Sequence, residues 1–195
     1  MSVIFGIVEK TRIIVAGDKR ATSQDGELIS DDMEKVIIIN KRVCLATAGN
    51  ASIAKAIMKR VEGSDNQDNL LVEDIIDIIK CFYAEVVEKS CDVIYGYPFK
   101  CIIAGKGRDG KPHLYSGGKF KSGFEYKEVP VVLFSPVDAS QDDCNKIFME
   151  NYKRHPKDFY KRIVKDISQI SKVVGASGNV WVYGFGTSTG KISEF

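Results

Sequence analysis

Ser2 is the first residue in the sequence whose position suggests chemistry, because only Met1 precedes it. A small second residue is the usual condition for removal of the initiator methionine, so the mature chain would begin with a serine that carries a free α-amine. Such an amine titrates near ~8 and is therefore partly neutral at about pH 7, where it can act as a general base. Because an adjacent base activates a serine hydroxyl, Ser2 is a candidate N-terminal nucleophile. Small residues are also common at this position for reasons unrelated to chemistry.

The segments that must position Ser2 follow it directly. Two largely apolar runs, 2–8 and 13–20, are separated by the charged residues 9–12, a pattern that predicts a β-hairpin. Residues 32–40 and 43–49 predict two further strands, and the second of these runs into a helix with Asn50 as its N-cap. The polar residues 22–31 predict a loop or strand pair beside the site, where substrate contacts are common.

This succession resembles the β-type subunits of the proteasome family and their simpler bacterial relatives, which are N-terminal-nucleophile hydrolases. That family has a nucleophile strand, an A-x-D-x-R-x-T turn, a D-x-x-K-I/V strand and an A-G turn into a helix. The chain has the corresponding residues at 16–22, 32–36 and 48–49. The resemblance puts Ser2 on the nucleophile position, Asp18 and Arg20 on the turn, Lys35 on the active-site lysine, and Gly49 on the oxyanion donor.

The resemblance weakens toward the C-terminus. Family members commonly have D-x-x-S-G before a late strand, and the aspartate and serine of this motif support the nucleophile. Ser177 matches the serine, but Val174 stands where the aspartate is expected. Ser135 falls near the family's G-S-G-S segment, which is otherwise absent. The proton-handling residues around the nucleophile are therefore altered, whereas Ser2, Lys35 and Gly49 remain.

Length and composition describe an ordinary globular chain. Its 195 residues predict a single domain over residues 1–195, and 28 basic against 26 acidic residues give a net charge of +2. This balance does not favour a nucleic-acid partner or a membrane surface, and no apolar run approaches the ~20 residues of a membrane span. The five cysteines are widely spaced and the two histidines are isolated, so neither a metal site nor a disulfide framework is predicted. We expect buried thiols in a reducing cytoplasm and no cofactor.

The order of predicted elements indicates the fold class. Strands up to residue 49 are followed by helices at 50–61 and 71–89, strands at 99–105, 113–115 and 129–134, helices at 140–153 and 156–173, and strands at 180–185 and 191–193. Two helix pairs between groups of strands predict an α+β protein with two packed sheets and helices outside each. The pattern alone leaves other α+β arrangements open. The family resemblance implies the four-layer αββα sandwich.

Two classes of function follow from these observations. In the first, the protein is a proteasome-like hydrolase, a protease that cleaves peptide or other amide bonds with mature Ser2 as nucleophile and Ser177 in a supporting role. In the second, it is a catalytically silent structural or assembly subunit, in which Asp18 and Lys35 form only a structural ion pair. Under either reading the resemblance implies a cytoplasmic homo-oligomer, ring-like as in its relatives, and leaves open an ATPase partner. Ile53, Ile57 and Phe82 are expected to be exposed and to serve the subunit contacts.

Overall fold

Two antiparallel five-stranded sheets form the centre of the protein in the computed structural model, which describes residues 2–23, 25–88, 99–120 and 123–195. The first sheet contains, in spatial order, β10 (Val131–Phe134), β1 (Ile4–Val8), β2 (Arg12–Asp18), β11 (Gly178–Gly184) and β12 (Thr189–Glu194). The second contains β5 (Val36–Asn40), β6 (Val43–Gly49), β7 (Phe99–Lys106), β8 (Pro112–Phe120) and β9 (Gly123–Glu128). A short ribbon, β3 (Ala21–Thr22) with β4 (Leu28–Ser30), stands apart.

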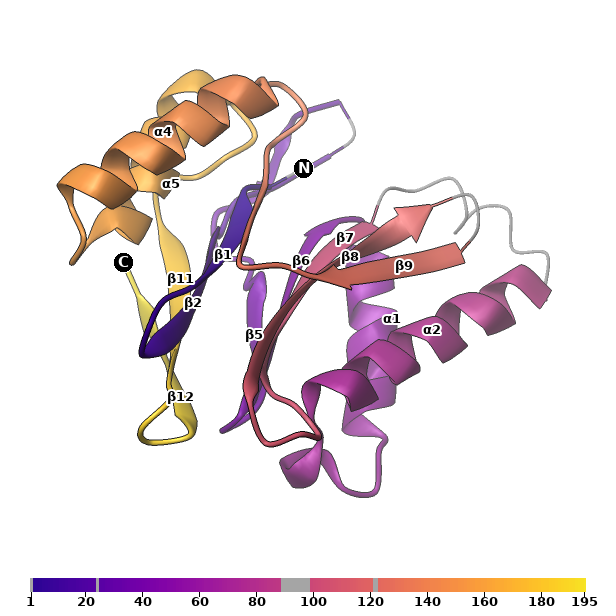
Figure 1. Ribbon diagram of the computed structural model, residues 1–195. Helices are drawn as coiled ribbons and strands as arrows, with labels where there is room; N and C mark the ends of the chain where they lie inside the picture. Colours follow the sequence, from indigo (N-terminus) through magenta and orange to yellow (C-terminus); the bar gives the residue numbers. More distant parts are fainter. Residues whose placement is uncertain (1, 24, 89–98, 121–122) are drawn as a thin grey trace.

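A pair of helices covers the outer face of each sheet, so the chain forms four layers (Figure 1). Helices α1 (Ala51–Glu62) and α2 (Val72–Glu88) pack on the second sheet, and a short 3₁₀ turn, η1 (Gln67–Asn69), joins them. Helices α4 (Gln141–Arg154) and α5 (Phe159–Ile170) pack on the first sheet. The predicted αββα sandwich is confirmed.

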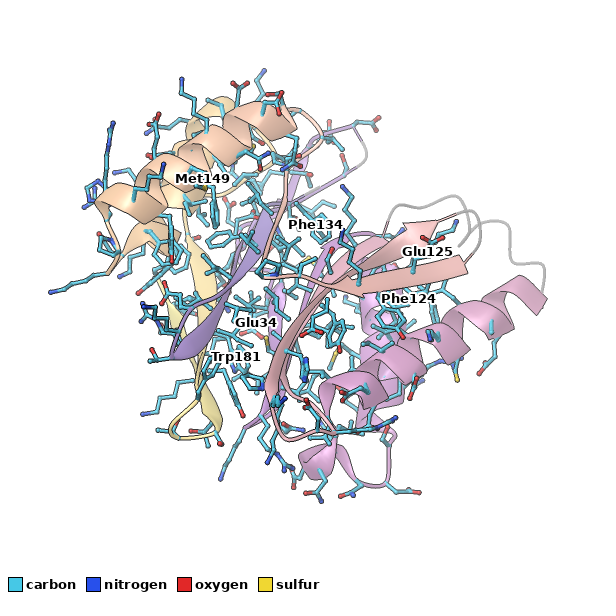
Figure 2. The ribbon with its side chains drawn as sticks, in the orientation of Figure 1. Glu34, Phe124, Glu125, Phe134, Met149 and Trp181 are labelled. Carbon is cyan, nitrogen blue, oxygen red and sulfur yellow. The ribbon has the colours of Figure 1, made fainter. Side chains whose placement is uncertain are left out.

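The two sheets pack on each other through small and β-branched side chains. Ile4 and Val15 from the first sheet meet Cys44, Ala46 and Ile102 from the second, and all five are fully buried. Trp181 of β11 lies in the same layer (Figure 2). Alternating residues of β1 and β2 face the helices on the other side, as Phe5 and Ala16 do. Both faces of the central strands are therefore apolar, which explains their nearly continuous hydrophobic runs.

The N-terminal hairpin is confirmed, and it lies at the centre of its sheet. β1 pairs with β2 through Ile4–Gly17 and Val8–Ile13, and the other edge of β2 pairs with β11. The chain therefore enters the fold through an interior strand rather than at an edge. This arrangement fixes the position of Ser2, two residues before Ile4, relative to the end of β2 at Asp18.

Several predictions of local structure need correction. Ile53, Ile57 and Phe82 are not exposed: each is at least 96% buried, in the apolar cluster between α1, α2 and the second sheet. These three side chains pack within the chain, so they are not available for contacts with a neighbouring subunit. Strand β9 had no predicted counterpart, because its sequence is rich in charge.

Cys91 and Met1 lie outside the described residues. Within the described parts of the chain, no helix combines the length and the apolar character that a membrane crossing requires.

Candidate functional site

Ser2 lies at the entrance of β1 and is 92% buried. The backbone of the next residue, Val3, is held at both polar groups by one partner. Its N–H donates to Asp18 Oδ1 over 3.0 Å, and its carbonyl accepts from the Asp18 N–H over 3.2 Å. The end of β2 therefore fixes the backbone that carries Ser2 through backbone pairing and a carboxylate together.

Asp18 and Lys35 form a buried ion pair behind Ser2. Lys35 Nζ donates to Asp18 Oδ2 over 2.8 Å, and the two side chains are 5% and 0% exposed. Lys35 also donates to the carbonyl of Arg20. Asp18 Oδ2 accepts further bonds from the backbone N–H groups of Arg20 at 3.0 Å and Gly175 at 3.2 Å. A buried pair is tolerated when its remaining hydrogen-bonding groups are satisfied, and this condition is met for the carboxylate.

Burial moves both members of this pair toward their neutral forms. Desolvation is the main cause that raises the pKa of Asp18, and it is opposed by the Lys35 charge and by the N–H groups of Gly175 and Arg20. Desolvation likewise lowers the pKa of Lys35, and the Asp18 carboxylate opposes this. Lys35 is therefore a cation that gives up its proton more readily than a surface lysine does.

Arg20 stabilises the turn between β2 and β3. Its guanidinium donates to Asp31 over 2.6 and 3.3 Å and to the carbonyl of Lys172 over 3.3 Å. These contacts join the N-terminal part of the chain to the segment after α5. The backbone carbonyl of Arg20 accepts the hydrogen bond from Lys35 Nζ. The side chain of Arg20 thus acts on the turn, and its backbone acts on the lysine.

Gly49 ends β6 and immediately precedes α1. Its φ of +108° lies in the region that side chains rarely adopt, which accounts for glycine at this position. The next residue, Asn50, caps α1 by accepting from the N–H groups of Ser52 and Ile53. The Thr47 N–H donates to the Lys35 carbonyl over 2.9 Å, so the end of β6 is tied directly to the residue that supplies the cation.

Ser2, Lys35 and Gly49 line one pocket of about 970 Å³. Its walls come from the β3–β4 ribbon, the end of β6, the first turn of α1 and the segments around residues 137–138 and 172–173. The predicted substrate-contacting segment 22–31 contributes Thr22, Ser23 and Ile29. This pocket therefore contains three of the six residues singled out from the sequence. Asp18 and Arg20 lie behind it and hold Lys35.

The C-terminal candidates occupy different surroundings. Ser177 is exposed and does not line the pocket, and its carbonyl accepts from the Lys19 N–H over 3.1 Å. Val174 is 1% exposed and packs in the apolar cluster with α5. Ser135 donates its hydroxyl to Gln141 Oε1 over 2.8 Å at the start of α4. The structure thus does not bring the hydroxyls of Ser177 and Ser135 into the pocket.

Asp138 lines the pocket and was missed by sequence reasoning. Its carboxylate accepts from the Ser171 hydroxyl over 2.7 Å and from the Lys172 N–H over 2.9 Å. These donors, together with the N–H of Val173, lower its pKa against the opposing effect of burial. Asp138 therefore fixes the segment that delivers the Gly175 N–H to Asp18. Its partners lie 33 and 34 residues away, so no local motif could have identified it.

No group of three or more histidine, cysteine, aspartate or glutamate side chains in the described parts of the chain is arranged as metal ligands. The pocket lining instead includes the Ser2 hydroxyl, the Lys35 ammonium group and the backbone of Gly49. Such a set can bind and polarise a carbonyl compound, which is the chemistry of acyl transfer.

The chain is similar in sequence to known proteins over much of its length. The family model described as Proteasome subunit matches residues 2–119, which include β1 to β7, α1 and α2. The chain is 27% identical over 133 residues to the proteasome subunit alpha of Archaeoglobus fulgidus, a match that covers 65% of this chain and 51% of that protein. The chain therefore spans about half the length of this curated relative.

Proposed function

The chain belongs to the proteasome family, and from this premise we propose that it is an N-terminal-nucleophile hydrolase of peptide bonds with mature Ser2 as its nucleophile. The observation that carries the proposal is the common pocket of Ser2, Lys35 and Gly49, with Lys35 held by the buried Asp18 carboxylate. A nucleophilic hydroxyl, a fixed cation and a backbone N–H at a helix N-terminus are groups that can support acyl transfer.

In the proposed reaction, Ser2 Oγ forms a bond to the carbonyl carbon of the substrate and transfers its proton to its own α-amine. The carbonyl oxygen becomes an oxyanion that accepts a hydrogen bond from the Gly49 N–H. When the tetrahedral intermediate collapses, the carbon–nitrogen bond breaks and the leaving amine takes up the proton. A water molecule then cleaves the serine ester, which releases the acid and restores Ser2.

Lys35 supports the first step through its charge. Among the described residues, Asp18 and the Arg20 carbonyl take two of its three ammonium hydrogens, which leaves one for the Ser2 hydroxyl. A nearby cation favours the ionised form of that hydroxyl. The lowered pKa of Lys35, caused by its burial, also lets it exchange a proton within the site more readily than a free lysine.

A second candidate is a catalytically silent structural subunit of an assembly. Val174 favours it, because this side chain is buried among apolar residues where the family resemblance calls for a carboxylate. The similarity to a protein named as an alpha subunit agrees with it as well.

Both candidates imply self-association into an oligomer, ring-like as in the family, and a cytoplasmic location. An ATPase partner is a further part of this proposal. Sedimentation that shows a monomer at micromolar concentration would contradict the oligomer.

An epoxyketone peptide tests the proposal, because it bonds to both a hydroxyl and the α-amine of the same N-terminal residue. Wild-type protein from its native host should have the mass of a chain that begins at Ser2, and the reagent should label that residue. Ser2→Ala should take up no label and should keep the wild-type midpoint of thermal unfolding. A Met1-free protein that neither reacts nor hydrolyses a peptide library would establish the silent subunit instead.

A further inference from the structure

A second, smaller pocket of about 270 Å³ is lined by strands β7, β8 and β9 of the second sheet and by Phe134 of β10 in the first. Phe99 and Lys100 come from β7, Ser116 and Gly118 from β8, Glu125 and Lys127 from β9, and Phe134 from β10. Figure 2 labels Phe134 and Glu125, two of these lining residues. None of these residues is used by the proposed catalytic steps.

Strand register places this pocket directly beside the Ser2 pocket. In the second sheet, Ala48 pairs with Lys100 and Gly49 with Phe99, so the linings of the two pockets are on neighbouring strands. Paired strands lie only ~4.8 Å apart. In the first sheet, Phe134 pairs with Ile4, two residues beyond Ser2. Both sheets therefore place the smaller pocket one strand away from the larger, on the β7–β10 side of Ser2 and Gly49.

The smaller pocket has free space over β8 because the residues at its centre, Ser116 and Gly118, are small. Lys100 pairs with Gly118, which pairs in turn with Glu125. On the same face, Ile102 pairs with Ser116, which pairs with Lys127. The absence of a large side chain at Ser116 and Gly118 leaves a hollow between the lysine on β7 and the charged residues on β9.

The charges around this hollow favour an anion. Lys100 Nζ stands 5.1 Å from the ring centroid of Phe134, a cation–π contact that holds the ammonium group at the pocket. Lys119 and Glu125 also line the pocket, and each has an interaction of its own. Lys100 and Lys127 form no ion pair with any carboxylate in the described part of the chain. A carboxylate that entered beside the Phe134 ring would meet two such ammonium groups.

We propose that this smaller pocket binds an acidic side chain of the peptide substrate, on one side of the bond that Ser2 cleaves. The inference rests on the proposed function, since it assigns a substrate preference to the same site. The larger pocket receives the residues on the other side of the bond. The preferred substrates are therefore peptides with glutamate or aspartate close to the cleaved bond, on one side of it only.

A binding experiment tests the preference without catalysis. We use a set of dye-labelled peptides that each contain one glutamate, at a different position in each peptide. Every peptide has a partner with glutamine at that position. Binding to the Ser2→Ala protein is measured by fluorescence anisotropy. The best glutamate peptide should bind about threefold to tenfold more tightly than its glutamine partner, as expected for partly exposed charge pairs. The difference should shrink at high salt.

Lysine variants assign the effect to the pocket. Lys100→Ala with Lys127→Ala should abolish the preference, and Lys100→Arg should retain it because the charge remains. Lys106→Ala is the matched control, since Lys106 lies at the other end of β7 and does not line the pocket. Equal binding of glutamate and glutamine peptides, or a preference that survives the double substitution, would overturn the assignment.

Hydrolysis separates this inference from the function on which it rests. Internally quenched versions of the same peptides should show the same preference in kcat/KM with the Ser2 enzyme. Peptides that bind with the preference but are never cleaved would refute the hydrolase and retain the binding site. Peptides that are cleaved with no such preference in any position would retain the hydrolase and refute the binding site.

Discussion

The two sides of the candidate site are built in different ways. On the N-terminal side, the residues that lead into β1 and β5 and the last residue of β2 supply side chains. These are the Ser2 hydroxyl, the Lys35 ammonium group and the Asp18 carboxylate. On the C-terminal side, the segment between α5 and β11 supplies backbone. The Gly175 N–H donates to Asp18, and the Lys172 carbonyl accepts from Arg20.

This difference explains how the site can lack the family's second carboxylate. Val174 turns into the apolar core, so it has no access to Asp18. Asp138 instead holds the segment from the pocket side through Ser171 and Lys172. If the hydrolase proposal is correct, the N-terminal side should dominate the chemistry and the C-terminal side should tune it.

Removing the cation should have the largest effect. We expect Lys35→Ala to slow epoxyketone labelling of Ser2 by about 10²–10⁴-fold, the range associated with a lost proton-transfer or charge-stabilising group. The variant also leaves Asp18 buried without its partner, which should lower the free energy of unfolding by ~3–5 kcal/mol. Labelling rate and urea unfolding are measured together. Lys19→Ala is the control, because Lys19 itself does not line the pocket and forms its ion pairs with Asp32 and Glu194 rather than with Asp18. A control that reacts as slowly as Lys35→Ala would contradict the assignment.

Restoring the missing carboxylate should damage the fold rather than improve the site. Val174→Asp would bury an unpaired charge among the side chains that pack α5 on the first sheet, so we expect a loss of ~3 kcal/mol or more in the free energy of unfolding. Urea unfolding measures this loss. The neighbouring Ala176 is exposed, and Ala176→Asp should change stability by less than ~0.5 kcal/mol. Faster labelling by a stable Val174→Asp protein would show that this side chain can turn toward Asp18.

A similar contrast separates the features that could be predicted from the sequence from those that could not. The N-terminal hairpin and the Asn50 cap are local patterns, and both were correct. The position of Ser177 in a motif gave no information on where its hydroxyl points. The role of Asp138 depends on contacts with residues more than thirty positions away in the sequence. The apolar stripes that contain Ile53 and Phe82 do not indicate whether a sheet of the same chain or another subunit covers them. Local chemistry can be predicted from sequence, whereas side-chain direction and long-range partners depend on packing.

The pH dependence of Ser2 labelling should report the burial of Lys35. The rate should rise as the α-amine loses its proton near ~8. It should fall again as Lys35 becomes neutral, and this fall should come below the ~10.4 of a free lysine, because burial lowers the pKa of Lys35. Lys35→Arg should remove the falling limb, since arginine stays charged over the whole range. A falling limb that is unchanged in Lys35→Arg would assign it to another group.

Loosening the segment between α5 and β11 should have a moderate effect on the rate of Ser2 labelling. Asp138→Ala removes the acceptor for Ser171 and Lys172, and we expect about fivefold slower labelling, equivalent to ~1 kcal/mol of positioning. Asp138→Asn should recover part of the rate because it keeps one acceptor oxygen. Asp143→Ala serves as the control, because it weakens the capping contact with Ser140 at the start of α4, close to Asp138 in sequence, but leaves the bonds to Ser171 and Lys172 intact. Equal slowing in both alanine variants would reduce the role of Asp138 to general stability.

The smallest effect should come from Ser177, and it is the sharpest test of how the two sides differ. Its hydroxyl is exposed and does not line the pocket, and its carbonyl bond to the Lys19 N–H survives in alanine. Ser177→Ala should therefore label within about twofold of the wild-type rate and unfold within ~0.5 kcal/mol of it. A loss comparable to that of Lys35→Ala would mean that the hydroxyl turns into the site when substrate binds. In that case the C-terminal side would contribute side-chain chemistry as well as backbone, and the contrast between the two sides would disappear.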